Sequence, residues 1–150
     1  MATYYEIIHL IERLHRLSLE VLKRELDRLG VRGINSVQAL ILYSMGKDQI
    51  SIRELTLRGH YLGSNVSYNL KRLVDCGYLL YERSPHDRRS VHVKVTPKGT
   101  ALQAQLEDFF KRSGRLMPTH GIEVSSLAHL GDKLYKLESF WSSVHIMRNV

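Results

Sequence analysis

Hydrophobic residues recur at spacings of three and four along three long stretches of the chain, which is the period of an amphipathic helix. The first stretch runs from residue 3 to residue 29, and Gly30 supplies a stop signal. The second begins at Pro97 and is predicted to end near residue 112, before Gly114. The third begins near Ser125 and carries a heptad seam, which consists of Leu127, Leu130, Leu134, Leu137, Trp141 and Val144.

The first and third of these helices expose more apolar surface than one chain of 150 residues is expected to cover. A helix over residues 3–29 would be roughly 40 Å long. We therefore predict that residues 1–30 and 123–150 are dimerisation helices that pack on a second copy of the chain, while residues 97–114 connect them to the rest. The interface residues would be those of the seam together with Leu10 and Leu14. A purely intrachain bundle is the alternative.

Shorter elements are predicted between the long helices. Asn35 followed by Gln38 is typical of a helix N-cap, and this helix would continue through the apolar run that ends at Gly46. Ile50 is expected to add a short edge strand. Ser51 and Glu54 then match a second capping box, and a glycine-containing turn over residues 58–63 leads to another helix. The order helix, turn, helix predicts a helix-turn-helix.

The helix that follows the turn ends at Gly77 and has two unlike faces. On a helical wheel, one buried stripe collects Val66, Leu70, Leu73 and Val74. Polar, aromatic and cationic side chains that can hydrogen-bond base edges and phosphates lie outside this stripe. We interpret this helix as a DNA recognition helix whose contact residues are Ser64, Asn65, Ser67, Tyr68, Lys71 and Arg72.

After residue 77 the apolar period changes from that of a helix to that of a strand. Residues 78–83 are rich in strand formers, and three valines between residues 91 and 95 alternate with polar residues. We therefore predict a β-hairpin with a polar tip over residues 84–90. Arg88 and Arg89 in this tip repel each other unless a polyanion or a carboxylate compensates them, and Asp87 can do so in the free protein. A hairpin placed directly after a recognition helix predicts a winged helix-turn-helix.

Positive charge is concentrated in the same part of the chain. Residues 51–98 contain nine Lys and Arg against four Asp and Glu, a net charge of +5, whereas residues 1–50 and 99–150 each carry only +1. Such a distribution is typical of a module that binds a polyanion and is held between nearly neutral arms. A basic surface that is merely solvated is the alternative.

Signals for other kinds of function are missing from the sequence. None of the eight histidines pairs with another at a spacing of three or four, and a single cysteine cannot complete a zinc signature. Phosphate-binding loops and nucleophile motifs are also absent, so we expect neither an enzyme nor a cofactor. Cys76 is interpreted as a small buried apolar residue, with a redox sensor as the alternative. One cysteine and no membrane-length apolar run predict a cytoplasmic protein.

The predicted wing resembles that of the MarR family of bacterial transcriptional regulators. That family carries an Asp-x-Arg motif before a strand that leads into Thr-x-x-Gly, and this chain matches it at Asp87, Arg89, Thr96 and Gly99. The resemblance implies a homodimer with recognition helices in successive major grooves and wing arginines in the flanking minor groove. Within the family, residues 63–70 are most similar to the LdtR-like branch.

We therefore predict one domain that is mainly α with a small β-hairpin, namely a winged helix-turn-helix core over residues 35–99 with flanking N- and C-terminal dimerisation helices. The predicted function is that of a regulator, expected to be a repressor, that binds double-stranded DNA at an inverted repeat as a homodimer. Asp87 would orient Arg89 in the wing. A winged helix that docks on a protein is the alternative function. MarR-like proteins also bind small aromatic effectors, for which Tyr43, Phe109 and Phe110 could line a cleft, although plain core positions are the alternative.

Overall fold

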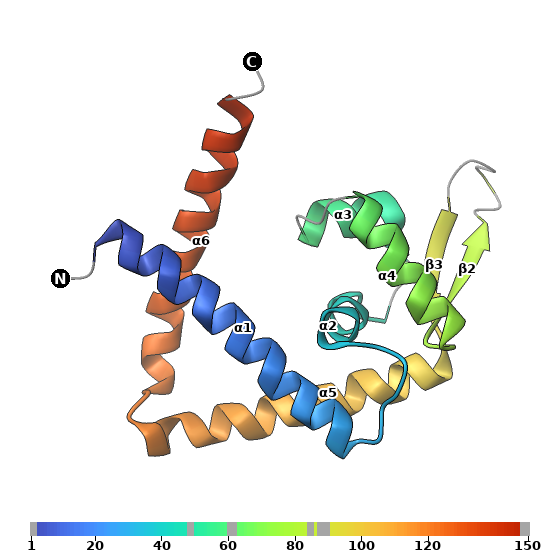
Figure 1. Ribbon diagram of the computed structural model, residues 1–150, viewed down its shortest axis with the longest axis horizontal. Coiled ribbons are helices and arrows are strands. Elements are labelled where there is room, and N and C mark those ends of the chain that lie inside the picture. The colour runs from blue at the N-terminus through green and yellow to red at the C-terminus, as the bar shows by residue number, and fades with distance from the viewer. Residues whose placement is uncertain (1–2, 48–49, 60–62, 84–85, 87–90, 148–150) are drawn as a thin grey trace. The chain divides into compact units, whose positions relative to one another are not determined.

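The computed structural model describes residues 3–47, 50–59, 63–83, 86 and 91–147. These residues form two compact units, the first up to Glu107 and the second from Asp108 onward. The first unit contains α1 (Tyr4–Arg28), α2 (Ser36–Ser44), β1 (Ile50–Ser51), α3 (Ile52–Gly59), α4 (Gly63–Asp75), β2 (Leu79–Arg83), β3 (Val91–Val95) and the first half of α5 (Pro97–Leu116) (Figure 1). The second contains the end of α5, the 3-10 turn η1 (Met117–His120) and α6 (Val124–Met147).

Reciprocal capping boxes begin both α1 and α2. The Asn35 side chain accepts a hydrogen bond from the backbone N–H of Gln38, and the Gln38 side chain accepts one from the backbone N–H of Asn35, both at 2.9 Å. This confirms the cap predicted for α2. Thr3 and Glu6 form an equivalent box at the start of α1, which was not predicted from the sequence. The Thr3 hydrogen bonds lower the pKa of the Glu6 carboxyl group because they stabilise its charged form.

Three of the predicted glycine stops are confirmed by left-handed backbone at the glycine. Gly30, Gly46 and Gly77, which follow α1, α2 and α4, have φ values of 71°, 67° and 80°, in the left-handed region that favours glycine. The prediction that Gly114 ends the third long helix is wrong, because α5 continues to Leu116. A glycine inside a helix costs only about 1 kcal/mol and does not by itself end it. The chain leaves the helix where η1 begins, with a proline in its first turn.

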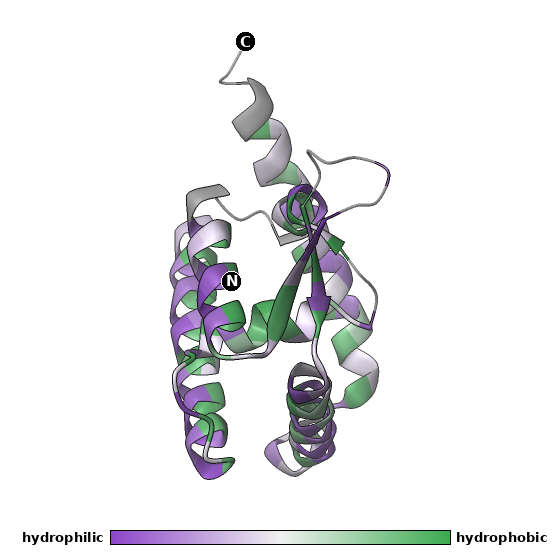
Figure 2. Cartoon of the chain, turned by 90° about the vertical axis from the view of Figure 1, so that its right-hand side faces the viewer, coloured by the Kyte–Doolittle hydropathy of each residue, from purple (hydrophilic) through white to green (hydrophobic). Residues whose placement is uncertain are grey.

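The core of the first unit is built where α4 packs on α2, α3 and β2. The predicted stripe is confirmed, since Val66, Leu70 and Leu73 have no exposed surface, while Val74 is half-buried. Burial of each such side chain contributes about 1.5–3 kcal/mol. Hydrophobic and hydrophilic residues alternate around the helices in keeping with this packing (Figure 2). Other fully buried residues include Ile41, Leu42, Leu79, Val93 and Leu106.

The three strands form one antiparallel sheet in the order β1-β3-β2. Val93 in the central strand pairs with Ile50 on one side and Tyr81 on the other, which confirms the predicted edge strand at Ile50. Of the three alternating valines, only Val93 is fully buried. Val91, at the start of β3, is 39% exposed.

The matched Thr-x-x-Gly motif has a structural role at the junction of α4 and α5. The Thr96 hydroxyl donates to the carbonyl of Gly77 at 2.6 Å and accepts a hydrogen bond from the N–H of Gly99 at 3.1 Å, so Thr96 caps α5 and holds the end of α4. A Cβ added at Gly99 would collide with the Tyr78 carbonyl oxygen and would lie 2.7 Å from a methyl group of Val95. Only glycine fits this close approach of helix and backbone.

We therefore expect Gly99→Ala to lower the free energy of unfolding by about 2 kcal/mol, since the added methyl group must displace backbone. Gly114→Ala is the matched control, because it lies in the same helix with no neighbouring atom within 4 Å of the new Cβ. This control should be neutral or more stable by about 0.5–1 kcal/mol. Urea denaturation followed by circular dichroism measures both, and equal stabilities of the two variants would contradict the packing described.

Candidate nucleic-acid interface

Helix α4 is held with one face in the core and the other toward solvent. Packing of its buried stripe on α2 and α3 makes a helix-turn-helix, and β2 and β3 follow α4 directly as the wing (Figure 1). Residues 60–62 of the predicted turn lie outside the described residues. Burial of this stripe fixes the rotation of α4 about its own axis. It therefore also determines which side chains of α4 face outward.

The outward face of α4 carries four of the residues that the sequence predicts to contact DNA. Asn65, Ser67, Tyr68 and Lys71 are all exposed, and the ring of Tyr68 is among the most exposed apolar groups, at 69%. The side chain of Ser64 lies outside the described part of the structure. Amide, hydroxyl and ammonium groups on one helix face can donate to and accept from base edges and phosphates.

Lys71 is paired with Asp75 one helical turn further on. Its Nζ lies 2.7 Å from the Asp75 carboxylate, and both side chains are largely exposed. This hydrogen bond is the main reason that the pKa of Lys71 is raised, so the ammonium group is fully charged at neutral pH. Since exposed ion pairs contribute little and exchange readily with water, Lys71 can leave Asp75 for a phosphate.

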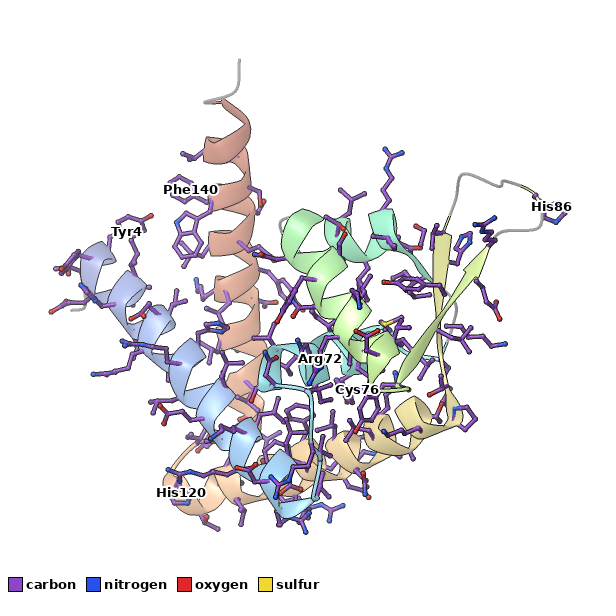
Figure 3. The ribbon with its side chains drawn as sticks, turned by 45° about the vertical axis from the view of Figure 1, so that its right-hand side comes forward. Tyr4, Arg72, Cys76, His86, His120 and Phe140 are labelled. Atoms are coloured by element: carbon purple, nitrogen blue, oxygen red, sulfur yellow. The ribbon has the colours of Figure 1, made fainter. Side chains whose placement is uncertain are left out.

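Arg72 has a partner that the sequence did not indicate. Its Nε donates to the carbonyl oxygen of Gly33 at 2.6 Å, across 39 residues of sequence. Figure 3 shows Arg72 and Cys76 at the C-terminal half of α4, on the side of the connection between α1 and α2. At least one donor of this guanidinium group is therefore used within the protein. A DNA contact by Arg72 stays a prediction for its remaining N–H groups.

Lys98, another cation of the basic region, lies at the C-terminal end of α4. Its Nζ donates to the Cys76 carbonyl at 2.8 Å and lies 4.5 Å from the centre of the Tyr78 ring. A cation is favourable there because the last carbonyls of a helix carry partial negative charge. Burial raises the pKa of the Tyr78 hydroxyl. Cys76 itself is half-buried, so it is less enclosed than the interpretation as a small buried apolar residue expects.

The tip of the wing lies largely outside the described residues, and so do Asp87, Arg88 and Arg89. Their predicted roles therefore stay predictions. The described flanks of the tip are polar, with Arg83 exposed at the end of β2 and the Lys94 ammonium 3.7 Å from the Glu82 carboxylate. His86 is exposed beyond the strands (Figure 3).

Helices α1 and α6 each carry exposed apolar residues in a single copy of the chain. In α1, Leu10 and Leu14 are 39% and 53% exposed. In α6 of the second unit, the seam residues Leu127 and Leu137 are half-buried, and the other four are more exposed, namely Leu130, Leu134, Trp141 and Val144. Contiguous apolar faces of this kind usually mark an interaction surface.

The described residues offer little sign of a site of another kind. Within them, no three His, Cys, Asp or Glu side chains are grouped to hold a metal ion. No helix in this part of the chain is long and apolar enough to span a bilayer. Tyr43 lies in the first compact unit, whereas Phe109 and Phe110 lie in the second, where their ring centroids are 5.2 Å apart. The aromatic effector cleft stays a prediction.

Comparisons with known proteins agree with this architecture. Residues 34–99 match the family model of a winged helix DNA-binding domain. Over 143 residues the chain is 35% identical to the exopolysaccharide II synthesis transcriptional activator ExpG of Rhizobium meliloti, covering 95% of this chain and 74% of that protein.

Solved structures share the fold over nearly the full length. FabT of Streptococcus pneumoniae in complex with DNA superposes with a TM-score of 0.73 at 21% identity, over 95% of this chain and 99% of FabT. A mutant of MarR from E. coli complexed with operator DNA gives a TM-score of 0.73 at 24% identity, over 91% and 99% of the two chains. The match to a winged helix DNA-binding domain and the 35% identity with ExpG show that the chain belongs to the family of winged helix transcriptional regulators that includes ExpG, and its fold is that of MarR.

Proposed function

We propose that this protein is a sequence-specific regulator of transcription that binds an inverted-repeat operator in double-stranded DNA as a homodimer. One observation carries the proposal: α4 buries Val66, Leu70 and Leu73 completely and presents Asn65 and Tyr68 on the exposed side of the same helix. Solvation alone does not explain why an amide and an exposed tyrosine ring lie together near the start of this helix.

The outward face of α4 suits the major groove of B-DNA. This groove is about 12 Å wide and admits a helix, and residues near the helix start meet base edges. Asn65 can pair with adenine through its amide, and the Tyr68 hydroxyl can donate to a base or a phosphate. Lys71, one turn later, is suited to the phosphate backbone. These assignments divide the face into a part that reads sequence and a part that binds phosphate.

The wing would contribute from the adjacent minor groove. We assign Arg88 and Arg89 to that groove or to its phosphates, where narrow A/T-rich segments attract cations. Asp87 is repelled by phosphate, so its role would be to orient Arg89. Arg83 and Lys94, which flank the tip, extend the positive potential along the hairpin.

Dimerisation would bury the apolar faces of α1 and α6. A closed two-fold dimer places its two recognition helices on half-sites about one helical turn apart, which requires an inverted repeat. This supports Leu10, Leu14 and the α6 seam as the interface. The aromatic effector, if one binds, would act on this dimer.

Repression is proposed for operators that overlap a promoter, because a bound dimer there blocks RNA polymerase. Activation is the second candidate, since the 35% identical relative ExpG is a transcriptional activator. The position of the operator would decide between the two. Membership of the LdtR-like branch likewise stays a prediction.

Docking on another protein is the alternative function, with the exposed Tyr68 ring as its anchor. The polar and cationic neighbours of Tyr68 favour DNA instead, because a protein-docking face more often exposes aromatic or aliphatic anchors. The two functions differ in their dependence on salt, which the first experiment below exploits.

The proposed function predicts different effects of α4 variants on specific and random DNA. Asn65→Ala and Tyr68→Phe should each weaken binding to the selected site by about 1–3 kcal/mol and leave binding to random duplex nearly unchanged, because they remove base contacts. Electrophoretic mobility shifts on both duplexes measure this. As a control, log affinity of the wild type should fall against log salt with a slope near −7, if about eight phosphates are neutralised. A slope shallower than about −3 would favour the docking alternative.

The pairing of Lys71 with Asp75 predicts that Asp75→Asn binds DNA several-fold more tightly. This change removes a negative charge next to the proposed phosphate ligand and releases the ammonium group. Glu54→Gln in α3 is the control, because it also removes one negative charge from the first unit. It measures how far the loss of a negative charge by itself strengthens DNA binding. Fluorescence anisotropy at low and high salt measures both variants, and an Asp75 effect no larger than that of Glu54 would argue against this role for Lys71.

The proposed dimer predicts that Leu134→Glu with Leu137→Glu yields a monomer or an aggregate with weak DNA binding. Two buried carboxylates in the seam cannot be compensated by a partner of the same sequence. Tyr135→Glu is the control, since Tyr135 lies on α6 outside the heptad seam and is 72% exposed. Sedimentation velocity at micromolar concentration gives the result. A wild-type protein that sediments as a monomer would refute the dimer itself.

A further inference from the structure

Helix α4 also carries a row of side chains at the border between its buried stripe and its outward face. Asn69, Arg72 and Cys76 follow one another at spacings of three and four, so they form one row along the helix. Arg72 and Cys76 contact residues 29–35, the connection between α1 and α2, which we call the strap, and Asn69 contacts Gln38 in α2 just beyond it. The proposed DNA contacts do not explain these contacts of the recognition helix.

The contacts between this row and the strap are specific. The Gly33 carbonyl accepts a hydrogen bond from the Arg72 Nε at 2.6 Å and lies 3.6 Å from the Cys76 Sγ. One turn earlier, the Asn69 Oδ1 accepts from the Gln38 Nε2 at 3.1 Å. Gln38 is only 3% exposed, and its amide oxygen also accepts from the N–H of Asn35 at the end of the strap.

The other side of the strap is anchored on α1. The N–H of Val31 donates to the Leu26 carbonyl at 2.9 Å, and the Ser36 hydroxyl donates to the Leu19 carbonyl at 2.8 Å. Residues of α1 that are buried lie only in its C-terminal half, at Leu22, Glu25 and Leu26, where α1 packs on α2. The strap joins this same half of α1 to the recognition helix.

We propose that the strap sets the position of the recognition helix relative to α1, with Gln38, Asn69 and Arg72 as positioning residues. This inference rests on the proposed function. Because α1 belongs to the proposed dimer interface, fixing α4 to α1 fixes the distance and rotation between the two recognition helices of a dimer. The strap thereby determines which spacing of operator half-sites the protein accepts.

The charge of Arg72 supports this role over that of a simple phosphate ligand. Hydrogen bonds from a charged guanidinium group are stronger than those between neutral groups, and the Arg72 guanidinium makes such a bond to the Gly33 carbonyl. Asn69 carries no charge, so any effect of its loss on DNA binding cannot come from fewer neutralised phosphates.

Gly33 offers a way to disturb the strap without substituting any residue of α4. Its φ is +86°, and a Cβ there would lie 3.0 Å from the Cys76 Sγ and 3.5 Å from the Arg72 guanidinium. Gly33→Ala would push the strap from α4. Gly30→Ala is the matched control, because its φ of +71° imposes similar backbone strain while the new Cβ has no neighbour within 4 Å.

The test measures tolerance of half-site spacing. The probes are the duplex that the wild type selects from a random library and the same duplex with one central base pair inserted or deleted. One base pair moves a half-site by about 3.4 Å and rotates it by about 35°. The wild type and Gly30→Ala should prefer the selected spacing by about tenfold or more.

In Gly33→Ala and in Asn69→Ala this preference should fall about threefold or more, while the slope of log affinity against log salt stays that of the wild type. A loss of stability alone would lower affinity equally on every probe. Equal spacing preferences in Asn69→Ala and wild type would overturn the proposal, even if Gly33→Ala does not fold. If the wild type selects no sequence from the library, the proposed function itself is contradicted, together with the role of the strap that rests on it.

Discussion

Burial of one stripe of α4 is the constraint on which the rest of this structure depends. Val66, Leu70 and Leu73 are fully enclosed by α2, α3 and the sheet, and together they contribute about 5–9 kcal/mol of hydrophobic free energy. Any rotation of α4 about its axis would expose part of that stripe. The outward direction of Asn65, Tyr68 and Lys71 is therefore a consequence of core packing.

A second constraint acts at the C-terminal end of the same helix. There the chain turns through Gly77, enters the wing, returns along β3, and starts α5 at Thr96, whose hydroxyl bonds back to the Gly77 carbonyl. Gly99 permits the close approach because a side chain would meet the Tyr78 backbone. The recognition helix, the base of the wing and α5 are thus joined at one point. The Thr-x-x-Gly motif has its physical explanation in this junction.

The basic middle of the chain is less available to a polyanion than its net charge of +5 implies. Lys71 pairs with Asp75, Lys94 with Glu82, and the cations of Arg72 and Lys98 are directed at backbone carbonyls. Net charge sets the long-range field that steers DNA toward this surface. Which cations then bind phosphate depends on how easily each one leaves its partner within the protein. Arg72 and Lys98, which are bound to backbone carbonyls, leave their partners less easily than Lys71 and Lys94 leave theirs.

The sequence by itself determined the secondary structure, the winged helix-turn-helix and the face of α4 that is buried, because periodicity, capping residues and strand alternation act between residues close in the chain. The end of α5 was missed, since Gly114 is only a weak stop signal. Only the tertiary structure decided the partners of Arg72 and Asn69. Gly33 lies 39 residues from Arg72, and Gln38 lies 31 residues from Asn69. A pattern among neighbouring residues cannot indicate which distant carbonyl or amide group comes within hydrogen-bond distance when the chain folds.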